Sequence, residues 1–503
     1  MSKKNLILLG FILLKFILQY FLISSGYDLH RDEYLHLDQA QHLAWGYTSV
    51  PPFTSWISWL IYFLGGSVFW VKFFPALFGA LTLVVVWKAV EELSGNLFAL
   101  TLSATCVLFS ALLAINTLYQ PNSFDVLSWT TFYFVLIQYF KTENPKWIYI
   151  AALVFSIGFL NKYNIVFLAI GLLPAILFTR FRKIFVKKEF YFAFIVGLLL
   201  ILPNLVWQYK NNFPVIHHLD ELTNTQLVHV DRLDFLKSQL LYFAGALLVI
   251  ISALYALLFY KPFEKYKTFF GAIIFTLIVF VYFKAKAYYA VGLYPIYIAF
   301  GSVFLANVLK NGWKKYLKPV LMILPVLFFM LMYHVAFPNK SPEYIVQNAR
   351  TYRWEDGQEH SLPQDFADML GWKELATKVD SVCAELPNPD NTLILCDNYG
   401  QAGAINYYTQ NKKVVAHSYS ADYINWISLD KKIENSILVK ETFYDRDKDR
   451  QKEAPLFDTV YLAAQRVNRY AREDTISIYV LKNAKVDVNK IIKEDVEERK
   501  KKI

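Results

Sequence analysis

The sequence predicts a polytopic α-helical membrane protein of about 11 spans, followed by a small soluble α/β domain. Of the 503 residues, 56% are hydrophobic and only 18% are charged, whereas soluble domains are nearly a quarter charged. The mean hydropathy is +0.31. Long apolar runs dominate up to Phe337 and stop after it. We therefore expect a membrane domain at residues 1–336 and a soluble domain at residues 337–503.

About 20 mostly apolar residues are needed for a helix to cross a bilayer. This criterion predicts spans at residues 5–23, 68–90, 97–116, 124–140, 147–160, 164–179, 190–208, 236–259, 268–283, 288–309 and 316–336. No small-residue cleavage site follows the first apolar run, so we interpret it as a retained span. Between the first two spans lies an outer loop, residues 24–67. Within it, residues 54–64 are too short to span and contain two tryptophans, which is typical of an interfacial helix.

Within residues 1–336, most of the positive charge lies outside the spans, in short loops and at the N-terminus. Sixteen Lys and Arg residues lie in the loops on the side of the N-terminus, against seven on the other side. Such a bias marks the cytoplasmic side, so the formal charge of +10 reflects topology and gives no support to nucleic-acid binding. Eleven spans then place the C-terminus outside. The outer loop with Asp32, Asp125, Lys162, the loop at 209–235 and Lys286 all fall on the outer side.

The soluble domain shows alternating helix and strand patterns. Helices are expected at 372–386 and 401–408, and strands at 392–396, 413–416, 436–439, 459–463 and 475–481. The three cysteines lack the spacing of a metal site. Two of them, Cys383 and Cys396, either pair in an oxidising compartment or stay as buried thiols.

Arg31, Asp32 and Glu33 follow the first span at the mouth of the membrane. Adjacent carboxylates are costly near lipid, which favours a chemical role at the membrane surface. The functional interpretation is a general base that takes a proton from an acceptor hydroxyl. The alternative is structural, because carboxylates also stabilise the first turn of a helix.

Three further outer-side positions are candidates for substrate binding. Asp125 opens the fourth span, either as a helix cap or as a second acid that binds a sugar hydroxyl or shares a divalent cation with Asp32. Lys162 with Tyr163, and Lys286 with Tyr288, each combine a cation and a hydroxyl, which suits a lipid phosphate. Lys162 can also simply extend its amine to the membrane surface.

The loop at 209–235 contains His217, His218 and His229 together with acidic residues. No tight metal-binding spacing is present, which favours loop polarity or a substrate contact at His218 over a zinc site. No Walker loop and no GxGxxG pattern occurs, so the sequence gives no support to a nucleotide site.

The first outer loop resembles that of the C-type (GT-C) membrane glycosyltransferases. The resemblance rests on Asp32-Glu33-Tyr34, Leu43-Ala44-Trp45-Gly46-Tyr47 and Pro51-Pro52. It is strongest for the bacterial relatives of dolichyl-phosphate-mannose protein mannosyltransferases, glycosyltransferase family 39. The lipid A aminoarabinose transferases are more distant relatives. Weaker similarities lie at Asn122–Asp125, Leu160–Tyr163, Pro203-Asn204 with Trp207, Tyr288-Tyr289 with Tyr294-Pro295, and Asn398–Gly400 with Ala402–Ala404 and Tyr407-Tyr408.

The resemblance implies transfer of a sugar from a polyisoprenyl-phosphate donor at the outer face of a bacterial cytoplasmic (inner) membrane. Asp32 matches the family's proposed base, and displacement of the lipid phosphate would invert the sugar. Lys162 and Lys286, with Arg31, would stabilise the phosphate charge. Glu33, Asp125 and His218 would orient sugar or acceptor. Some eukaryotic members carry an inserted lumenal domain, whereas here the soluble domain is C-terminal, so lipid, glycan and protein acceptors all stay open.

Two other classes of protein compete with this interpretation. A transporter or flippase of lipid-linked sugars would show paired repeats and ionisable groups near the bilayer midplane. Here charged residues within spans are few, among them Lys15, Lys72 and Lys88, and the polar groups gather at one face. A membrane-anchored binding module would not need eleven spans. Both alternatives rank below the enzyme.

Overall fold

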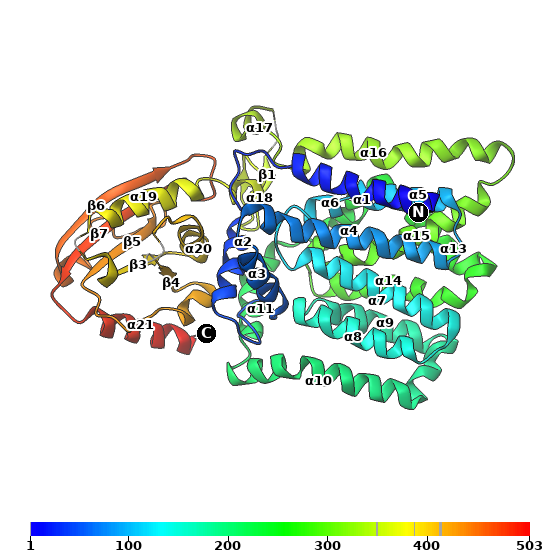
Figure 1. The fold of residues 1–503 in the computed structure, drawn as a ribbon, viewed down its shortest axis with the longest axis horizontal. Helices are drawn as coiled ribbons and strands as arrows, with labels where there is room; N and C mark the ends of the chain where they lie inside the picture. The colour runs from blue at the N-terminus through cyan, green and yellow to red at the C-terminus, as the bar shows by residue number, and fades with distance from the viewer. Residues whose placement is uncertain (1, 349–350, 387, 412–414, 503) are drawn as a thin grey trace.

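The chain has two parts that lie side by side along the longest axis of the molecule, a bundle of long helices and a smaller α/β region (Figure 1). The computed structural model describes residues 2–348, 351–386, 388–411 and 415–502. The bundle contains α1 (Lys3–Phe21), α4 (Val68–Glu92), α5 (Leu97–Leu108), α6 (Leu112–Ile115), α7 (Asn122–Thr142), α8 (Lys146–Asn161), α9 (Ile165–Leu177), α10 (Lys188–Lys210), α12 (Arg232–Tyr242), α13 (Leu247–Phe259), α14 (Lys267–Tyr282), α15 (Tyr294–Val308) and α16 (Leu317–Ala336).

Within the described residues, six helices are long and apolar enough to cross a membrane, or up to eight if each of two bent pairs is one span. The bent pairs are Ile165–Leu177 with Arg180–Val186, at 111°, and Arg232–Tyr242 with Ala244–Phe259, at 66°. Each of the eleven predicted spans coincides with helix, but those at 97–116 and 236–259 are interrupted. The predicted fold class, a polytopic helical membrane protein with a small C-terminal α/β region, is confirmed.

The two interruptions contact each other. Each break leaves a backbone group without a partner in its own helix. The backbone N–H of Ala111 donates to the carbonyl of Tyr242 over 3.0 Å, so these two groups pair with each other. The second break contains Gly245, where an added Cβ would lie 2.6 Å from the Cα of Pro325 in α16. The break therefore lets two backbones approach more closely than side chains would permit.

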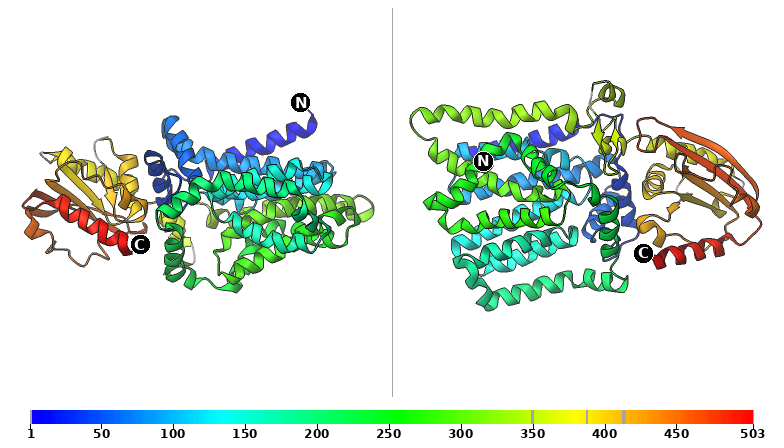
Figure 2. Two further views of the ribbon diagram at one scale, coloured as in Figure 1. Left: turned by 90° about the horizontal axis from the view of Figure 1, so that it is seen from below. Right: turned by 180° about the vertical axis from the view of Figure 1, so that it is seen from behind.

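The outer loop folds into two short helices, α2 (Arg31–Asp38) and α3 (Phe53–Phe63). The predicted interfacial helix at 54–64 corresponds to α3. In all three views α2 and α3 lie between the bundle and the α/β region (Figures 1 and 2). Leu29 and Tyr34 at α2 share one buried apolar cluster with Trp372 and Ile405 of the α/β region. The two parts of the chain therefore meet at the outer loop.

The α/β region is built on a five-stranded mixed sheet with strand order β4-β3-β5-β7-β6. Strand β3 runs parallel to β4 and β5, and β7 is antiparallel to β5 and β6. The strands are β3 (Thr392–Cys396), β4 (Ala416–Ser418), β5 (Asn435–Glu441), β6 (Phe457–Val467) and β7 (Thr475–Ala484). A separate pair is formed by β1 (Tyr352–Arg353) and β2 (Glu359–His360).

Helices cover both faces of this sheet. Residues of α19 (Trp372–Ala384) and α20 (Tyr399–Tyr408) pack on one face, and those of α21 (Val488–Lys502) pack on the other. The other short helices are α11 (Pro214–Thr225), α17 (Pro342–Asn348) and α18 (Gln364–Ala367). Residues 413 and 414 of the strand predicted at 413–416 lie outside the described residues, and β4 begins at the last residue of the prediction. Cys106, Cys383 and Cys396 are free, buried thiols, so the last two do not pair.

Candidate active site

The start of α2 is fixed by reciprocal hydrogen bonds between His30 and the first helical turn. The His30 ring accepts from the backbone N–H of Asp32, and the Glu33 carboxylate accepts from the backbone N–H of His30 over 2.7 Å. This arrangement is a capping box. Glu33 is fully buried, and it also accepts from Lys72 of α4 and from the backbone N–H of Tyr119. Its carboxylate therefore ties α2 to the membrane bundle.

Asp32 is held by donors from both parts of the molecule. The Tyr399 hydroxyl of α20 donates to one carboxylate oxygen over 2.7 Å, and the Gln120 amide donates to the other over 3.1 Å. The side chain is 35% exposed, so it is open to a reactant. Burial raises the pKa of Asp32. The charges of His30 and Arg31 and the hydrogen bond from Tyr399 together lower this pKa by more than burial raises it, so the net shift is downward. Asp32 is therefore ionised at neutral pH.

A continuous chain of hydrogen bonds joins Asp32 to Lys162. Beyond Gln120, the Asn122 amide donates to the Gln120 oxygen over 2.8 Å, and the Lys162 amine donates to the Asn122 oxygen over 2.7 Å. Lys162 lies in the short connection between α8 and α9. Burial lowers its pKa to about 8, and Asp125 opposes this shift. The amides of Gln120 and Asn122 thus hold the acid Asp32 and the cation Lys162 at a fixed separation.

Aromatic rings and a second cation surround Lys162. Its amine lies 4.3 Å from the ring centre of Tyr289 and 5.2 Å from that of Tyr288. Lys286 precedes these tyrosines and forms an ion pair with Glu355, which comes from the segment between β1 and β2. Lys162, Lys286 and Tyr288 therefore lie close together in the structure.

The two carboxylate oxygens of Asp125 differ in their hydrogen bonding. The amide of Asn164 donates to Oδ2 over 2.9 Å, whereas Oδ1 is buried and has no hydrogen-bond partner among the residues that the structure describes. Tyr163 points elsewhere, because its hydroxyl donates to Asn204, whose amide donates in turn to the carbonyl of Trp45 in the outer loop. Tyr163 thus braces the outer loop against α10.

The other two predicted substrate-binding residues lie at the edge of this cluster. The Arg31 guanidinium faces the α/β region, 4.5 Å from the ring centre of Tyr399 and 3.5 Å from the Asn398 oxygen. Burial, opposed by the charges of Glu221 and Asp422, lowers the pKa of His218, which lies on α11. No described contact joins His218 to Asp32 or to Lys162.

Two of the contacts to Asp32 could not be found from local patterns. Gln120 lies in an irregular connection, and Tyr399 is 367 residues away in sequence. The one sequence signal for Tyr399 is its place in the Asn398–Gly400 segment that resembles the transferases. Within the described residues, no group of three or more His, Cys, Asp or Glu side chains could hold a metal ion.

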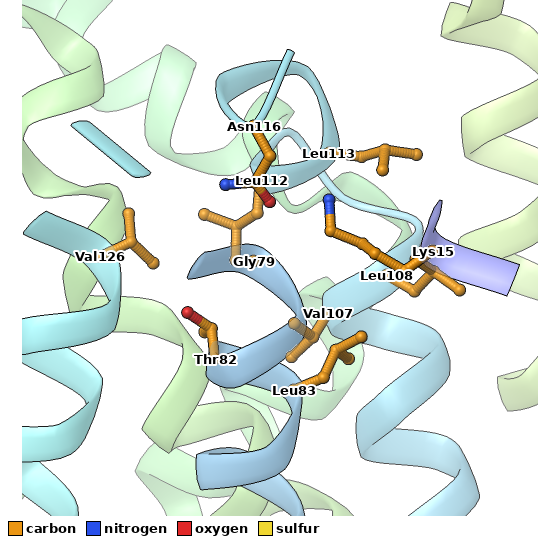
Figure 3. A pocket seen from close by; sticks show the side chains of 10 residues that line it. All are labelled: Lys15, Gly79, Thr82, Leu83, Val107, Leu108, Leu112, Leu113, Asn116 and Val126. Carbon is orange, nitrogen blue, oxygen red and sulfur yellow. The ribbon is translucent and has the colours of Figure 1, made fainter. Parts of the chain in front are cut away.

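A small internal cavity of about 10 Å³ lies inside the bundle, between α1, α4 and α5–α7. Figure 3 shows the Lys15 side chain reaching from α1 toward the segment that carries Leu112 and Asn116. The Lys15 amine donates to Gln19 over 2.9 Å, and the Gln19 amide donates to the Asn116 carbonyl over 2.8 Å. These bonds hold the segment that leads to Gln120, so Lys15 supports the site without contacting it.

The comparisons with known proteins agree with this architecture. Residues 49–207 match the sequence model of the dolichyl-phosphate-mannose-protein mannosyltransferase family. ArnT from Cupriavidus metallidurans bound to undecaprenyl phosphate superposes with a TM-score of 0.63 at 12% identity, covering 95% of this chain and 98% of that one. Its apo state gives a TM-score of 0.62 with the same identity and coverage. No curated protein matches the sequence.

The fold of the chain is similar to that of ArnT, and residues 49–207 are similar in sequence to the mannosyltransferase family. The match to the mannosyltransferase family over residues 49–207 covers the second half of the outer loop and extends through Asp125 and Lys162. The resemblance predicted from the outer loop is therefore confirmed, and the chain is a multi-pass membrane protein.

Proposed function

We propose that this protein transfers a sugar from a polyisoprenyl-phosphate donor to the hydroxyl group of an acceptor, with inversion at the sugar. The hydrogen-bonded chain from Asp32 through Gln120 and Asn122 to Lys162 carries the proposal. It holds a base and a cation at fixed positions, which such a displacement requires. The undecaprenyl phosphate bound to ArnT, which shares this fold, supports a polyisoprenyl-phosphate donor.

In the proposed reaction, Asp32 takes the proton of the acceptor hydroxyl as its oxygen attacks the anomeric carbon. The bond between that carbon and the phosphate oxygen breaks, and its electron pair stays on the polyisoprenyl phosphate. Lys162 and Lys286 stabilise the negative charge that develops there. The buried Oδ1 of Asp125, which has no hydrogen-bond partner among the described residues, accepts a hydrogen bond from the sugar. Asp32 then releases its proton to water through its exposed side.

The remaining predicted residues act indirectly in this scheme. Arg31 holds the Tyr399 ring, Glu33 anchors α2, and Tyr163 braces the outer loop. We place residues 1–336 in a catalytic membrane domain and residues 337–503 in an extracytoplasmic domain that completes the site through Tyr399. The positive charge of the opposite loops supports a cytoplasmic location for them and an outer location for Asp32.

The test is sugar release from a panel of polyisoprenyl-phosphate sugars by the purified protein, comparing wild type with Asp32→Asn. We expect the variant to lose at least about a hundredfold in turnover, since it removes the general base. Asp234→Asn is the matched control, because Asp234 is an exposed acid on α12 that pairs only with Lys237 within the described residues. Normal turnover by a folded Asp32→Asn protein that binds donor would refute the proposal. Donor binding without turnover in wild type, given each acceptor class in turn, would favour a carrier of these lipids.

A further inference from the structure

A basic cavity of about 520 Å³ lies at the end of the bundle opposite the α/β region. Helix α9 begins beside Lys162 and runs for 13 residues, about 20 Å, away from the candidate active site. The cavity is formed where α9 ends and α14 begins. It is therefore separate from the site that contains Asp32.

Four cations line this cavity, Arg180, Lys261, Lys265 and Lys267, against the single acid Glu264. Within the described part of the chain, none of the four forms an ion pair. Lys141, at the same end of the bundle, is by contrast neutralised by Glu92 over 2.7 Å. The cavity thus collects positive charge that the protein itself does not balance.

The two segments that form the cavity are held together by direct contacts. The Thr268 hydroxyl donates to the Thr179 hydroxyl over 3.1 Å, which ties the start of α14 to the end of α9. Below this contact the two helices pack closely, because Gly171 lies against Thr276 and Gly271 lies against Ala175. The cations therefore project from two segments that are fixed relative to each other.

Exposed apolar side chains continue from the cavity along the same two helices. Phe178 lines the cavity, is 82% exposed and stacks on Phe275 of α14. Leu173 and Leu177 on α9 and Ile278 on α14 are also exposed. An unneutralised basic cavity above an apolar helix face matches a molecule with an anionic head and hydrocarbon tails. Basic pockets between membrane helices bind phospholipid head groups in this way.

We propose that this cavity binds the phosphate head group of an anionic phospholipid, whose acyl chains lie along the exposed face of α9 and α14. The proposal does not depend on the proposed sugar transfer, since the cavity lies at the other end of the bundle. Phosphate is the chemistry that the cations recognise, and the apolar face selects a lipid over a soluble phosphate.

The test measures the thermal stability of the full-length protein in detergent during titration with phosphatidylglycerol, phosphatidylcholine or inorganic phosphate. We expect phosphatidylglycerol to raise the Tm at concentrations at which the other two have no effect. In Lys261→Gln/Lys267→Gln, the concentration of phosphatidylglycerol needed for half of this rise should increase at least about tenfold, the equivalent of 1.4 kcal/mol. Both lysines are exposed, and neither forms an ion pair within the described residues, so the variant should fold normally.

The matched control is Lys314→Gln/Lys315→Gln, which removes two exposed lysines between α15 and α16 at the same end of the bundle. This control should bind phosphatidylglycerol as wild type does. Equal loss in both double variants would show general attraction to the charged end and would overturn the proposal. So would unchanged binding in the cavity variant. An equal response to inorganic phosphate would overturn the lipid assignment.

Discussion

The hydroxyl of Tyr399 is the contact that the α/β region makes with the proposed base. It donates to Asp32, and a hydrogen bond to the ionised form of a carboxylate lowers its pKa. Tyr399→Phe removes this bond, so the pKa of Asp32 should rise. The acidic limb of the profile of kcat/KM against pH should therefore move to higher pH.

Tyr407→Phe is the control for this measurement. Tyr407 lies on the same helix, α20, but its hydroxyl donates to the carbonyl of Gly66 and does not touch Asp32. Its pH profile should coincide with that of wild type. A Tyr399→Phe profile that keeps the wild-type acidic limb would show that Tyr399 has no influence on the group that titrates.

Lys286 forms an ion pair with the carboxylate of Glu355. Its ion pair with Glu355 is partly exposed, so its strength is at most about 1 kcal/mol. A donor phosphate must compete with Glu355 for the amine. Glu355→Gln should therefore lower the KM for the donor by up to about fivefold, with little change in kcat. Initial rates at varied donor concentration measure this, with the exposed Glu359→Gln as control. An unchanged or higher KM would exclude the competition.

At the scale of elements, the positions of the helices were predictable and their interruptions were not. Apolar runs of sufficient length specify where chain can cross a bilayer, and each of them contains helix. At the break near Ala111, the free backbone N–H bonds to the carbonyl of Tyr242. At the other break, Gly245 lies close against the backbone of Pro325. Both are contacts between distant segments, which no local pattern encodes.

The packing of α1 against α4 depends on a glycine. A Cβ at Gly79 would lie 2.1 Å from the Asn116 side-chain oxygen and 2.5 Å from the Lys15 side chain. Gly79→Ala should therefore destabilise the protein by about 1–3 kcal/mol, as overpacking does. Gly10→Ala in α1 is the control, because a Cβ at Gly10 would meet nothing within 4 Å among the described residues, and alanine favours helix there. Thermal unfolding in detergent compares them, and equal Tm values would contradict the role of Gly79.

At the scale of the whole molecule, the α/β region is part of the candidate active site. Tyr399 reaches Asp32 from it, and Glu355 reaches Lys286 from the adjoining segment. The sequence indicates the acids and cations of the membrane domain, because a charged group beside an apolar run is conspicuous. It does not indicate their partners, since a tyrosine in a soluble α/β region has many ordinary roles. The contact between the helical bundle and the α/β region at α2 is seen only in the folded structure.

Asp38 makes the stability of the contact between the α/β region and α2 dependent on pH. Its carboxylate is buried where the α/β region meets α2, and it accepts from Asn406 and Tyr423 over 2.7 and 2.6 Å. Burial, which exceeds the effect of these two bonds, raises the pKa of Asp38 to about 6, against about 3.9 in an unfolded chain. The folded state therefore binds the proton more tightly. Stability is lost as the pH rises from about 4 to about 6, by up to about 3 kcal/mol.

Asp38→Asn keeps an oxygen that can accept from Tyr423 but carries no charge to bury. Its Tm should exceed that of wild type at about pH 7, and the difference should vanish below about pH 4, where Asp38 is protonated in both the folded and the unfolded state. Asp220→Asn, at an exposed position on α11, should match wild type at both pH values. A constant difference between Asp38→Asn and wild type across this range would mean that the charge is not what opposes docking. If Asp38→Asn is more stable than wild type only at neutral pH, ionised Asp38 is the group that opposes docking of the α/β region on α2. Because Tyr399 reaches Asp32 from the α/β region, ionised Asp38 would then also oppose the placement of Tyr399 beside Asp32.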